Sequence, residues 1–557
     1  MPFKLLIPVR ISFVFLAVIL LALPAFGQVG TCDETQAEAF LEAGNIRAPI
    51  YNNGALFWNR SNTLYEVPKG SGISAMFTST FVLGGLINGS LRSASSTFGP
   101  YEFWPGPLDS EGNPPDDCST YDEIWEIRSD DFALYDQQGI VSDNLLNWPW
   151  HLGAPVVDGD GNPNNYNLKD GDRPELLGDQ LLWWIMNDRG SEHEWSKTQP
   201  IGLEVRASAF AFVHARSGGD ITFYRYHLTN KNTAPLTDAY AGMFLDPDLG
   251  NAADDHMGSD SLLHLGYTYN GDPLDENGYE DTPPAIGYTF LLTPEAQRDS
   301  IDNDYDGQVD EPGETAGMHA AIPFEGGGGI QGDPGDGAEM YTFLQGLWQN
   351  GDPMTVGGNG AHYSNKPTRY AYSGDPITQP FWTERQPYSD SSLGANPPGD
   401  KRFLVTSGPF TLLPGESTEI LLALVWARGS NYLDSVRKLK GIVGNMQATP
   451  SEYLVSGYRP ELLTPPPSFE FPLGFDQNFP NPFTWSTTIR YSLPKPMQVR
   501  LAVYDLLGRE IEVLAQGDHE AGTYSLEFDG SQLPPGIYYA RIELDHYQFT
   551  RKLVRIP

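Results

Sequence analysis

Residues 201–230 read IGLEVRASAFAFVHARSGGDITFYRYHLTN and decide the fold class. Every second residue from Leu203 to Val213 is apolar, and this period of two predicts a β-strand. Towards the end of that strand both alternating sets become apolar, which is typical of burial on both faces. The turn residues RSGGD at 216–220 precede a second stretch of this kind, so the sequence predicts an antiparallel hairpin.

The same alternation recurs along most of the chain. Residues 403–412 and 420–426 repeat it around Pro414 and Gly415, which predicts a second hairpin. Glycine (59 residues) and proline (46 residues) are abundant, and aromatic residues make up 12% of the chain, too many for a disordered protein. We therefore predict an all-β fold, with a multi-domain β-sandwich body and few helices.

One helix is predicted at residues 431–446. Apolar residues recur there at helical spacing, Asn431 is a favourable N-cap, and Pro450 ends the pattern. An amphipathic stripe of this kind predicts a helix that covers an edge of a sheet. Its apolar positions are Leu433, Val436, Leu439, Ile442, Val443 and Met446.

Residues 1–27 have the plan of a secretory signal peptide. Two basic residues precede an apolar run at 11–23, and small residues at positions 25 and 27 precede Gln28. The run is shorter than the roughly 20 residues that a membrane-spanning helix needs. We expect cleavage before Gln28, with the Sec machinery and signal peptidase as partners.

The length of the chain predicts more than one domain. A single core seldom exceeds about 250–300 residues, so a chain of 557 residues predicts at least two domains. We expect a β-rich extracellular body at 28–458, with two subdomains that meet near 190–200. A proline-rich linker at 459–468 and a C-terminal sandwich at 469–557 follow.

The charge of the chain argues against one class of partner. The formal net charge is −38, which repels phosphates, so we expect no nucleic-acid partner. Such a surface suits a protein that binds cations or stays soluble outside the cell. The two cysteines, Cys32 and Cys118, would reach an oxidising compartment that permits a disulfide, and the sequence leaves their pairing open.

Residues 469–557 contain six or seven short alternating stretches at the spacing of a β-sandwich. Arg551 and Lys552 lie in the last of them, and basic residues are typical of a strand at an exposed sheet edge. The region also contains ordered sequence blocks. They are NFPNPF at 478–483, TIRYSLP at 488–494, VYDLLGRE at 503–510, AGTY at 521–524, LPPGIYY at 533–539 and TRKLV at 550–554.

These blocks resemble the C-terminal sorting domain of type IX secretion, a domain of the FlgD Ig-like kind. The resemblance implies an Ig-like β-sandwich and the type IX outer-membrane secretion machinery as a partner. It also implies that the protein is secreted or attached to the outer cell surface of a diderm bacterium. Four blocks of the body resemble uncharacterised exported proteins that end in this domain, and they imply secretion rather than a reaction. They are YNNGALF at 51–57, YEVPKG at 65–70, FWPGPL at 103–108 and GDQLLWW at 178–184.

The strongest local motif is DNDYDGQVDE at residues 302–311. Carboxylates at alternate positions can face one centre, and Gly307 permits the sharp turn. Calcium takes six to eight oxygen ligands, so the loop predicts a calcium site and resembles EF-hand loops. It departs from them at the twelfth position, Gly313, so the bidentate ligand would be Glu311 or Glu314. The predicted ligands are Asp302, Asp304, Asp306, Gln308, Asp310 and Glu311.

Two further acidic clusters are weaker calcium candidates, and the alternative for each is a solvated turn. The second of these clusters follows a predicted strand at 239–245. Its crowded carboxylates repel one another unless a cation or a hydrogen-bond donor compensates their charge. The candidate ligands of the first cluster are Asp158, Asp160, Asn162, Asp170 and Asp172. Those of the second are Asp246, Asp248, Asp254, Asp255 and Asp260.

The sequence contains no GxSxG, no HExxH and no phosphate-binding loop. The acid–histidine cluster at 192–194 is interpreted as structural. We therefore predict a calcium-stabilised, non-catalytic surface protein of adhesive or structural function. The alternative is a secreted carbohydrate-active protein, a glycoside hydrolase or a glycan binder, with a glycan or another surface ligand as its partner. A groove lined by exposed tryptophan, with two carboxylates about 5–10 Å apart, would favour that alternative.

Overall fold

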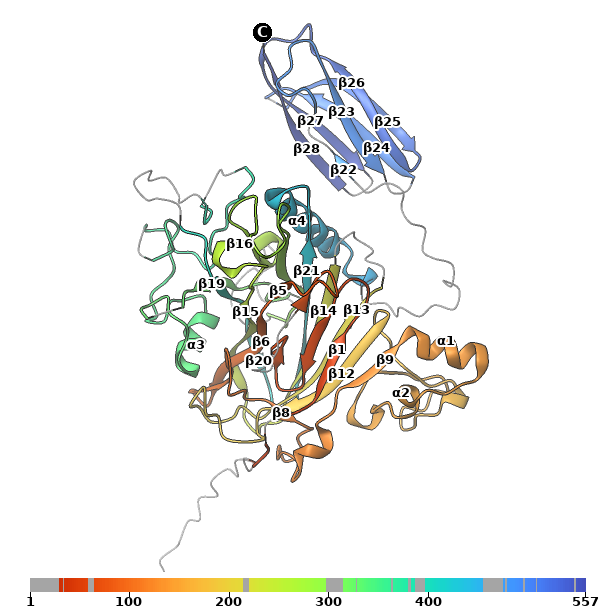
Figure 1. Ribbon diagram of the computed structural model, residues 1–557, viewed down its shortest axis with the longest axis vertical. Helices are drawn as coiled ribbons and strands as arrows, with labels where there is room; N and C mark the ends of the chain where they lie inside the picture. The colour runs from red at the N-terminus through yellow and green to blue at the C-terminus, as the bar shows by residue number, and fades with distance from the viewer. Residues whose placement is uncertain are drawn as a thin grey trace, which may run out of the picture. The chain divides into compact units, whose positions relative to one another are not determined.

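The computed structural model divides the chain into two compact units, Met1–Tyr458 and Arg459–Pro557 (Figure 1). The predicted signal peptide, the predicted linker and the loop at 302–311 lie outside the described residues. No helix in the described part is long and apolar enough to cross a membrane. The described residues are 30–33, 35–58, 65–213, 220–296, 314–326, 328–361, 364–378, 382–385, 396–453, 474–475, 478–493, 496–506, 508–544 and 547–556.

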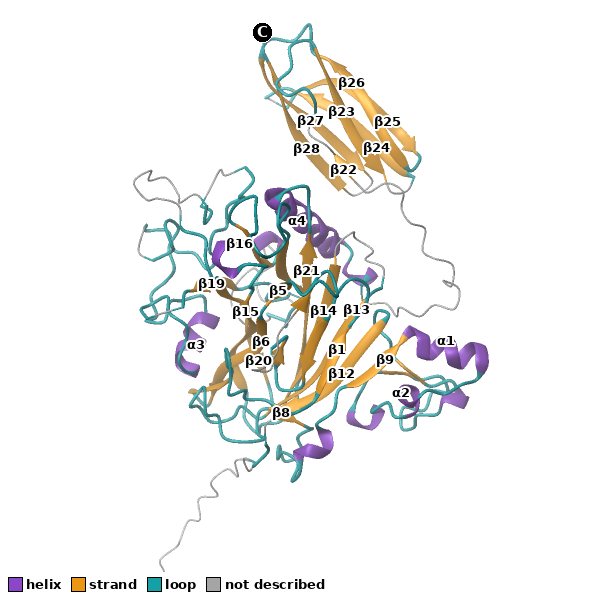
Figure 2. Ribbon diagram, viewed as in Figure 1, coloured by secondary structure: helices purple, strands orange, loops and turns teal. Residues whose placement is uncertain are grey.

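The first unit, called the body below, contains two large antiparallel sheets (Figure 2). The nine-stranded sheet has the order β16 (Asp255–Asp260), β17 (Leu265–Asn270), β18 (Ala285–Leu292), β21 (Ser417–Ala427), β14 (Asp220–Asn230), β13 (Leu203–Ala211), β12 (Gln180–Asn187) and β8 (Trp104–Pro105), and β9 (Trp125–Arg128) also pairs with β12. The eight-stranded sheet has the order β1 (Glu38–Leu41), β2 (Ala48–Tyr51), β3 (Ala55–Leu56), β6 (Thr78–Ile87), β15 (Leu236–Asp246), β20 (Arg402–Leu412) and β19 (Ala320–Phe324), and β7 (Ser90–Ala94) also pairs with β6. Two small sheets pair β4 (Tyr65–Glu66) with β5 (Ser74–Met76) and β10 (Val156–Val157) with β11 (Arg173–Pro174).

The main core lies between the two large sheets. Leu182, Trp184 and Met186 of β12 belong to it, and so do Phe81 of β6 and Met243 of β15. Side chains from both sheets therefore interlock, which is the packing of a β-sandwich. With the antiparallel sheets and few helices, this packing confirms the predicted fold class.

The opposite face of the nine-stranded sheet is buried as well. Leu181, Trp183 and Ile185 alternate with the residues of the main core along β12 and enter a second core. This double burial explains why β12 reads QLLWWIMN, with a nearly unbroken apolar run. It also explains why Trp183 and Trp184, side by side in sequence, are both buried.

The predicted helix is confirmed as α4 (Tyr432–Ala448), and the Asn431 side chain caps it by accepting hydrogen bonds from the backbone N–H groups of Leu433 and Asp434. It contacts β17, β18 and β21, so it covers a face of the nine-stranded sheet rather than the predicted edge. The remaining α-helices are α1 (Ser129–Gln138), α2 (Asp143–Leu146) and α3 (Gly337–Leu344). The 3₁₀ helices are η1 (Cys118–Tyr121), η2 (Trp150–Leu152), η3 (Leu168–Asp170), η4 (Ala252–Asp254), η5 (Ser261–Leu263) and η6 (Pro450–Glu452).

One predicted hairpin is confirmed and the other is wrong. Strands β13 and β14 pair from Leu203↔Asn230 to Ala211↔Thr222. Strands β20 and β21 do not pair with each other, because β20 joins β15 and β19 whereas β21 joins β14 and β18. The short connection at 413–416 thus crosses from one sheet of the sandwich to the other. Alternation identified both strands, but strand partners depend on the rest of the fold.

The predicted subdomain boundary near 190–200 is also wrong. That segment joins β12 to β13, and the two strands pair over their length from Gln180↔Ala211 to Asn187↔Glu204. Both strands contribute to the same core, and the contact pattern keeps the body as one unit. Among the described residues, each of the two cores of the body contains side chains from both sides of the segment, so the segment does not separate two subdomains.

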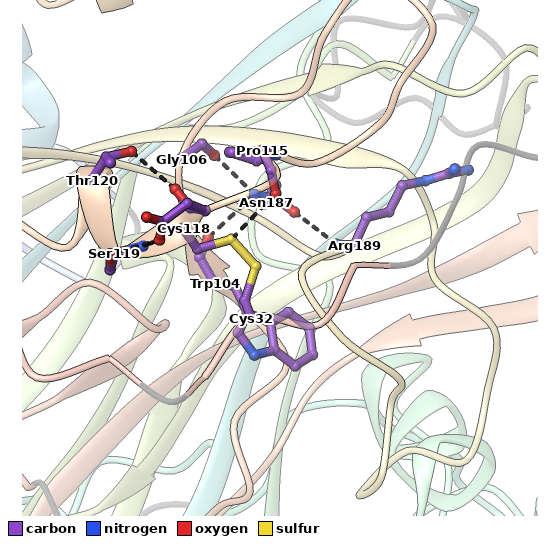
Figure 3. The surroundings of a disulfide bond; sticks show 10 residues. Cys32, Trp104, Gly106, Pro115, Cys118, Ser119, Thr120, Asn187 and Arg189 are labelled. Atoms are coloured by element: carbon purple, nitrogen blue, oxygen red, sulfur yellow. Dashed lines mark hydrogen bonds between the residues drawn. A yellow bond between two sulfur atoms is a disulfide. The ribbon is translucent and has the colours of Figure 1, made fainter.

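A disulfide joins Cys32 to Cys118, which answers the question that the sequence left open (Figure 3). Their Cα atoms lie 5.6 Å apart, although 86 residues separate them in sequence. The backbone N–H of Cys32 donates a hydrogen bond to the carbonyl of Gly190, 2.7 Å away. The bridge therefore ties the first described residues to η1 and to the loop after β12.

The second unit is a smaller sandwich of two sheets. Its apolar core includes Tyr491, Leu501 and Ile542. All of the predicted strands are present, and the basic strand with Arg551 and Lys552 is the outermost strand of its sheet, as predicted. One sheet has the order β22 (Gly474–Phe475), β23 (Ser486–Leu493) and β26 (Gly522–Asp529). The other has the order β25 (Glu510–His519), β24 (Met497–Tyr504), β27 (Gly536–Leu544) and β28 (Tyr547–Arg555).

Replacing both Cys32 and Cys118 with serine should lower the free energy of unfolding by about 2–4 kcal/mol, because the bridge closes a long loop in the unfolded chain. Denaturant unfolding of the mature protein measures this loss. Dithiothreitol should destabilise the wild type by a similar amount and leave the double variant unchanged. If dithiothreitol does not change the free energy of unfolding of the wild type, the two cysteines are not bridged.

Candidate metal centre

The acidic cluster near residue 160 assembles in part. Asp158, Asp160 and Asp172 each bring a carboxylate oxygen within 4.8 Å of the others. Asp158 accepts hydrogen bonds from the backbone N–H groups of residues 160–162, and buried Asp172 accepts them from Gly159 and Asn167. Asp170 is exposed and is not part of this group, whereas the backbone N–H of the exposed Asn162 donates a hydrogen bond to Asp160 at 2.8 Å. Backbone donors therefore already compensate much of the charge of this loop.

The second cluster assembles around the end of β15. Asp246 and Asp248 bring carboxylate oxygens within 4.8 Å of Asp400, a residue that sequence analysis did not select. Asp246 is buried, with 3% of its surface exposed, whereas Asp400 lies at the surface. Asp260 lies elsewhere, where it accepts a hydrogen bond from the backbone of Leu263 and pairs with Lys440 of α4 at 2.9 Å.

Burial and crowding raise the pKa values of these carboxyls. Burial, and then the neighbouring Asp248, raise the pKa of Asp246 to about 8, although Arg402 opposes the shift. Burial, and then Asp400, raise the pKa of Asp248 to about 6. Burial, and then Asp275, raise the pKa of Asp254 to about 6, and burial raises that of Asp255 well above its usual value. These carboxyls are therefore harder to ionise than exposed ones, because their surroundings compensate a negative charge poorly.

Within the described residues, several of these buried oxygens have no hydrogen-bond partner. They are Oδ1 of Asp246, Oδ1 of Asp255 and both carboxylate oxygens of Asp254. Buried polar atoms are nearly always paired in folded proteins, so unpaired carboxylate oxygens are informative. Carboxylate oxygens are hard ligands of the kind that calcium prefers, so the chemistry of these aspartates fits a calcium ion.

We did not predict Asp400 from the sequence, because the predicted hairpin gave β20 the wrong partner. In the structure β20 pairs with β15, with Leu245 opposite Phe403. This pairing brings the residues before β20 next to the residues after β15. Asp400 and Asp333 both pair with Arg402, at 2.9 Å and 2.6 Å. The correct pairing of β15 with β20 would have placed Asp400 near Asp246.

The surroundings of the acid–histidine cluster at 192–194 are consistent with a structural role. Glu192 and Glu194 are exposed, whereas His193 is buried. The two ring nitrogens of His193 each lie 2.7 Å from a backbone carbonyl oxygen, that of Ser93 and that of Asp188. Both nitrogens are thus engaged by the main chain, as the sequence interpretation expected.

A groove of roughly 690 Å³ lies beside β14, β20 and β21. Its lining includes Glu419, whose pKa is lowered to about 2 by hydrogen bonds from His227 and then from Arg225. A general acid for glycoside hydrolysis needs a raised pKa, so Glu419 is unsuited to that task. Phe410, the aromatic residue of the described lining, is 4% exposed and offers no open stacking face.

The tryptophans do not form a sugar-binding surface on the body. Every tryptophan that the structure describes in the body is buried or half-buried. Trp485 is 67% exposed, and it belongs to the second unit. Tryptophan therefore serves core packing in the body, where its large apolar surface stabilises the fold.

Comparison with known proteins assigns the C-terminal unit. Residues 477–556 match the family described as the secretion system C-terminal sorting domain. This is the sorting domain of type IX secretion, so the protein is exported to the cell surface or extracellular space of a diderm bacterium and interacts with the type IX machinery. No curated protein matches the chain.

Two solved structures show weak similarity. One is the polysaccharide lyase BACCELL_00875, with 10% identity, a TM-score of 0.20, and coverage of 72% of this chain and 38% of that protein. The other is dimeric latent PorU from Porphyromonas gingivalis, with 8% identity, a TM-score of 0.14, and coverage of 72% and 33%. The chain thus spans 38% of the first protein and 33% of the second, and TM-scores this low support no inference about fold or function.

Replacing Glu419 with glutamine should lower stability at pH 7 by about 1 kcal/mol, a figure reduced for the partial exposure of the pair. The pKa of Glu419 is about 2 in the folded state, against an ordinary value of 4.5. The stabilisation is therefore fully present above about pH 4.5 and is lost as the pH falls through about 2. Urea unfolding of both proteins at several pH values should show their difference closing in acid, and a constant difference would contradict the lowered pKa.

Proposed function

We propose that this protein is a secreted or surface-attached β-sandwich, stabilised by calcium, that acts as a non-catalytic adhesive or structural protein. The sorting domain supports the location. The observation that carries the rest is the group of Asp246, Asp248 and Asp400 at the end of β15, where Oδ1 of the buried Asp246 has no hydrogen-bond partner among the described residues. Export brings these ligands to an environment where calcium reaches the concentrations that extracellular sites require.

The loop at 302–311 supports the calcium proposal from the sequence, since its residues lie outside the described part. Its flanks are described: the backbone N–H of Ala296 donates a hydrogen bond to the carbonyl of Glu314, 3.0 Å away. The described residues on either side of 297–313 are thus held together. The cluster of Asp158, Asp160 and Asp172 is a third proposed site.

The non-catalytic part of the proposal has separate support. His193 is engaged by backbone carbonyls, and the pKa of Glu419 is lowered rather than raised. The described tryptophans of the body are buried or half-buried, so the feature that would favour a carbohydrate-active protein is missing among the described residues. A glycan or another surface ligand remains the proposed partner of the adhesive function.

The arrangement of the C-terminal unit supports an Ig-like sandwich of the FlgD kind. Its described strands form sheets of three and four, the number of an Ig-type domain. We propose that the signal peptide at 1–27 takes the chain through the Sec machinery, that signal peptidase removes it, and that this sandwich then engages the outer-membrane step.

Deleting residues 469–557 should leave the body in the periplasm, because the sorting domain is removed and the body remains folded. Cell fractionation with an antibody against the body measures its location. As a control, residues 459–557 fused to a periplasmic reporter should direct that reporter out of the cell. Wild-type amounts of the truncated protein in the medium or on the cell surface would contradict the proposal.

Calcium should raise the melting temperature of the mature protein, and the double variant Asp304→Asn/Asp306→Asn should lose part of that rise. An ion that binds only the folded chain stabilises it by RT ln(1 + [L]/Kd), about 2.7 kcal/mol at a hundredfold excess over Kd. Differential scanning calorimetry in chelator and in millimolar calcium measures the shift. An identical calcium-dependent shift in the double variant would exclude this loop as a site.

A further inference from the structure

The end of β15 and the beginning of β20 meet in the eight-stranded sheet (Figure 1). Asp246 is the last residue of β15, and Asp248 follows it in the next loop. Asp400 precedes β20, which begins at Arg402. Strand pairing therefore brings together three carboxylates from two segments that lie about 150 positions apart in sequence, all with oxygens within 4.8 Å of one another.

The backbone fixes the position of Asp246, but its Oδ1 has no hydrogen-bond partner within the described residues. Asp246 pairs with Thr78 across the sheet, and its carbonyl accepts a hydrogen bond from the backbone N–H of Phe77 at 3.0 Å. Asp246 is 3% exposed, and its Oδ1 has no hydrogen-bond partner among the described residues. Burying a polar atom without a hydrogen bond is costly, so Oδ1 is an atom that a bound cation would satisfy.

The Arg402 side chain also brings positive charge to these carboxylates, and several acidic residues share it. One of its terminal nitrogens lies 2.6 Å from Asp333 and the other 2.9 Å from Asp400. Its Nε lies 3.5 Å from Oδ2 of Asp246 without forming a hydrogen bond. One positive charge thus faces four carboxylates, those of Asp246, Asp248, Asp333 and Asp400, and the group keeps a net charge of about −3 when all are ionised.

We propose that Asp246, Asp248 and Asp400 form a divalent-cation site that takes calcium. All three offer hard oxygen donors, and backbone carbonyls and water are the ligands that usually complete the shell of a calcium ion. The ion fastens the segment at 396–401 to the loop after β15. The inference rests on the proposed calcium-stabilised body and assigns that role to a particular site.

The segment at 396–401 is attached to its neighbours by hydrogen bonds and ion pairs. The backbone N–H of Gly399 donates to the carbonyl of Asp255 at 3.0 Å, that of Asn396 donates to the carbonyl of Glu384 at 3.2 Å, and Lys401 pairs with Glu384 at 2.8 Å. An ion bound to Asp400 would add an anchor at the point where the chain enters β20. Since β20 is an interior strand of its sheet, between β15 and β19, this anchor acts on the core of the sandwich.

Calorimetric titration of calcium chloride into the chelator-treated mature protein tests the site with two variants. Asp400→Asn changes an exposed residue, so the variant should fold, and it should weaken one binding event by about tenfold or more. Asp246→Asn should abolish that event. A purely structural aspartate would instead leave calcium binding intact.

Asp260→Asn is the matched control. Asp260 belongs to the same acidic stretch of sequence, but it pairs with Lys440 outside the site, so this variant should keep the wild-type titration. If the wild type binds calcium and both site variants keep the full titration, the inference is overturned and the proposed calcium-stabilised body stands. If the wild type binds no calcium at all, the inference and that proposal fail together.

Discussion

The nine-stranded sheet packs apolar side chains on both of its faces, and the rest of the body is arranged around this requirement. In β21, Leu422 and Leu424 enter the core between the sheets, whereas Leu421 and Val425 enter the core under α4. Each such side chain contributes about 1.5–3 kcal/mol when it is fully buried. A second sheet is therefore needed on one face and α4 on the other.

This packing explains the path of the chain and the position of the acidic group. The strands cross between sheets at 413–416, because β20 and β21 belong to opposite layers. Crossing at that point places β20 beside β15, with Asp246 and Asp400 at the same end. The proposed ion site is thus a consequence of strand order rather than of one continuous loop, unlike the predicted site at 302–311.

Local patterns in the sequence predicted local structure well. The hairpin at 201–230 and the helix with its Asn431 cap depend on neighbouring residues, and both are present in the structure. The proposed pairing of β20 with β21 and the boundary near 190–200 depended on contacts between distant segments, and both were wrong. The same limit left Asp400 unrecognised, since its position depends on non-local strand pairing, and it left the Cys32–Cys118 pairing open.

The amount of calcium held by the exported protein tests the account most directly. Equilibrium dialysis of the mature protein against radioactive calcium at about 1 mM, the range of extracellular sites, counts the bound ions per chain without reference to stability. The account predicts at least one ion per chain, released by chelator and displaced poorly by magnesium, which prefers a smaller and more rigid shell. A protein that carries the sorting domain, is exported and binds no calcium under these conditions would contradict it.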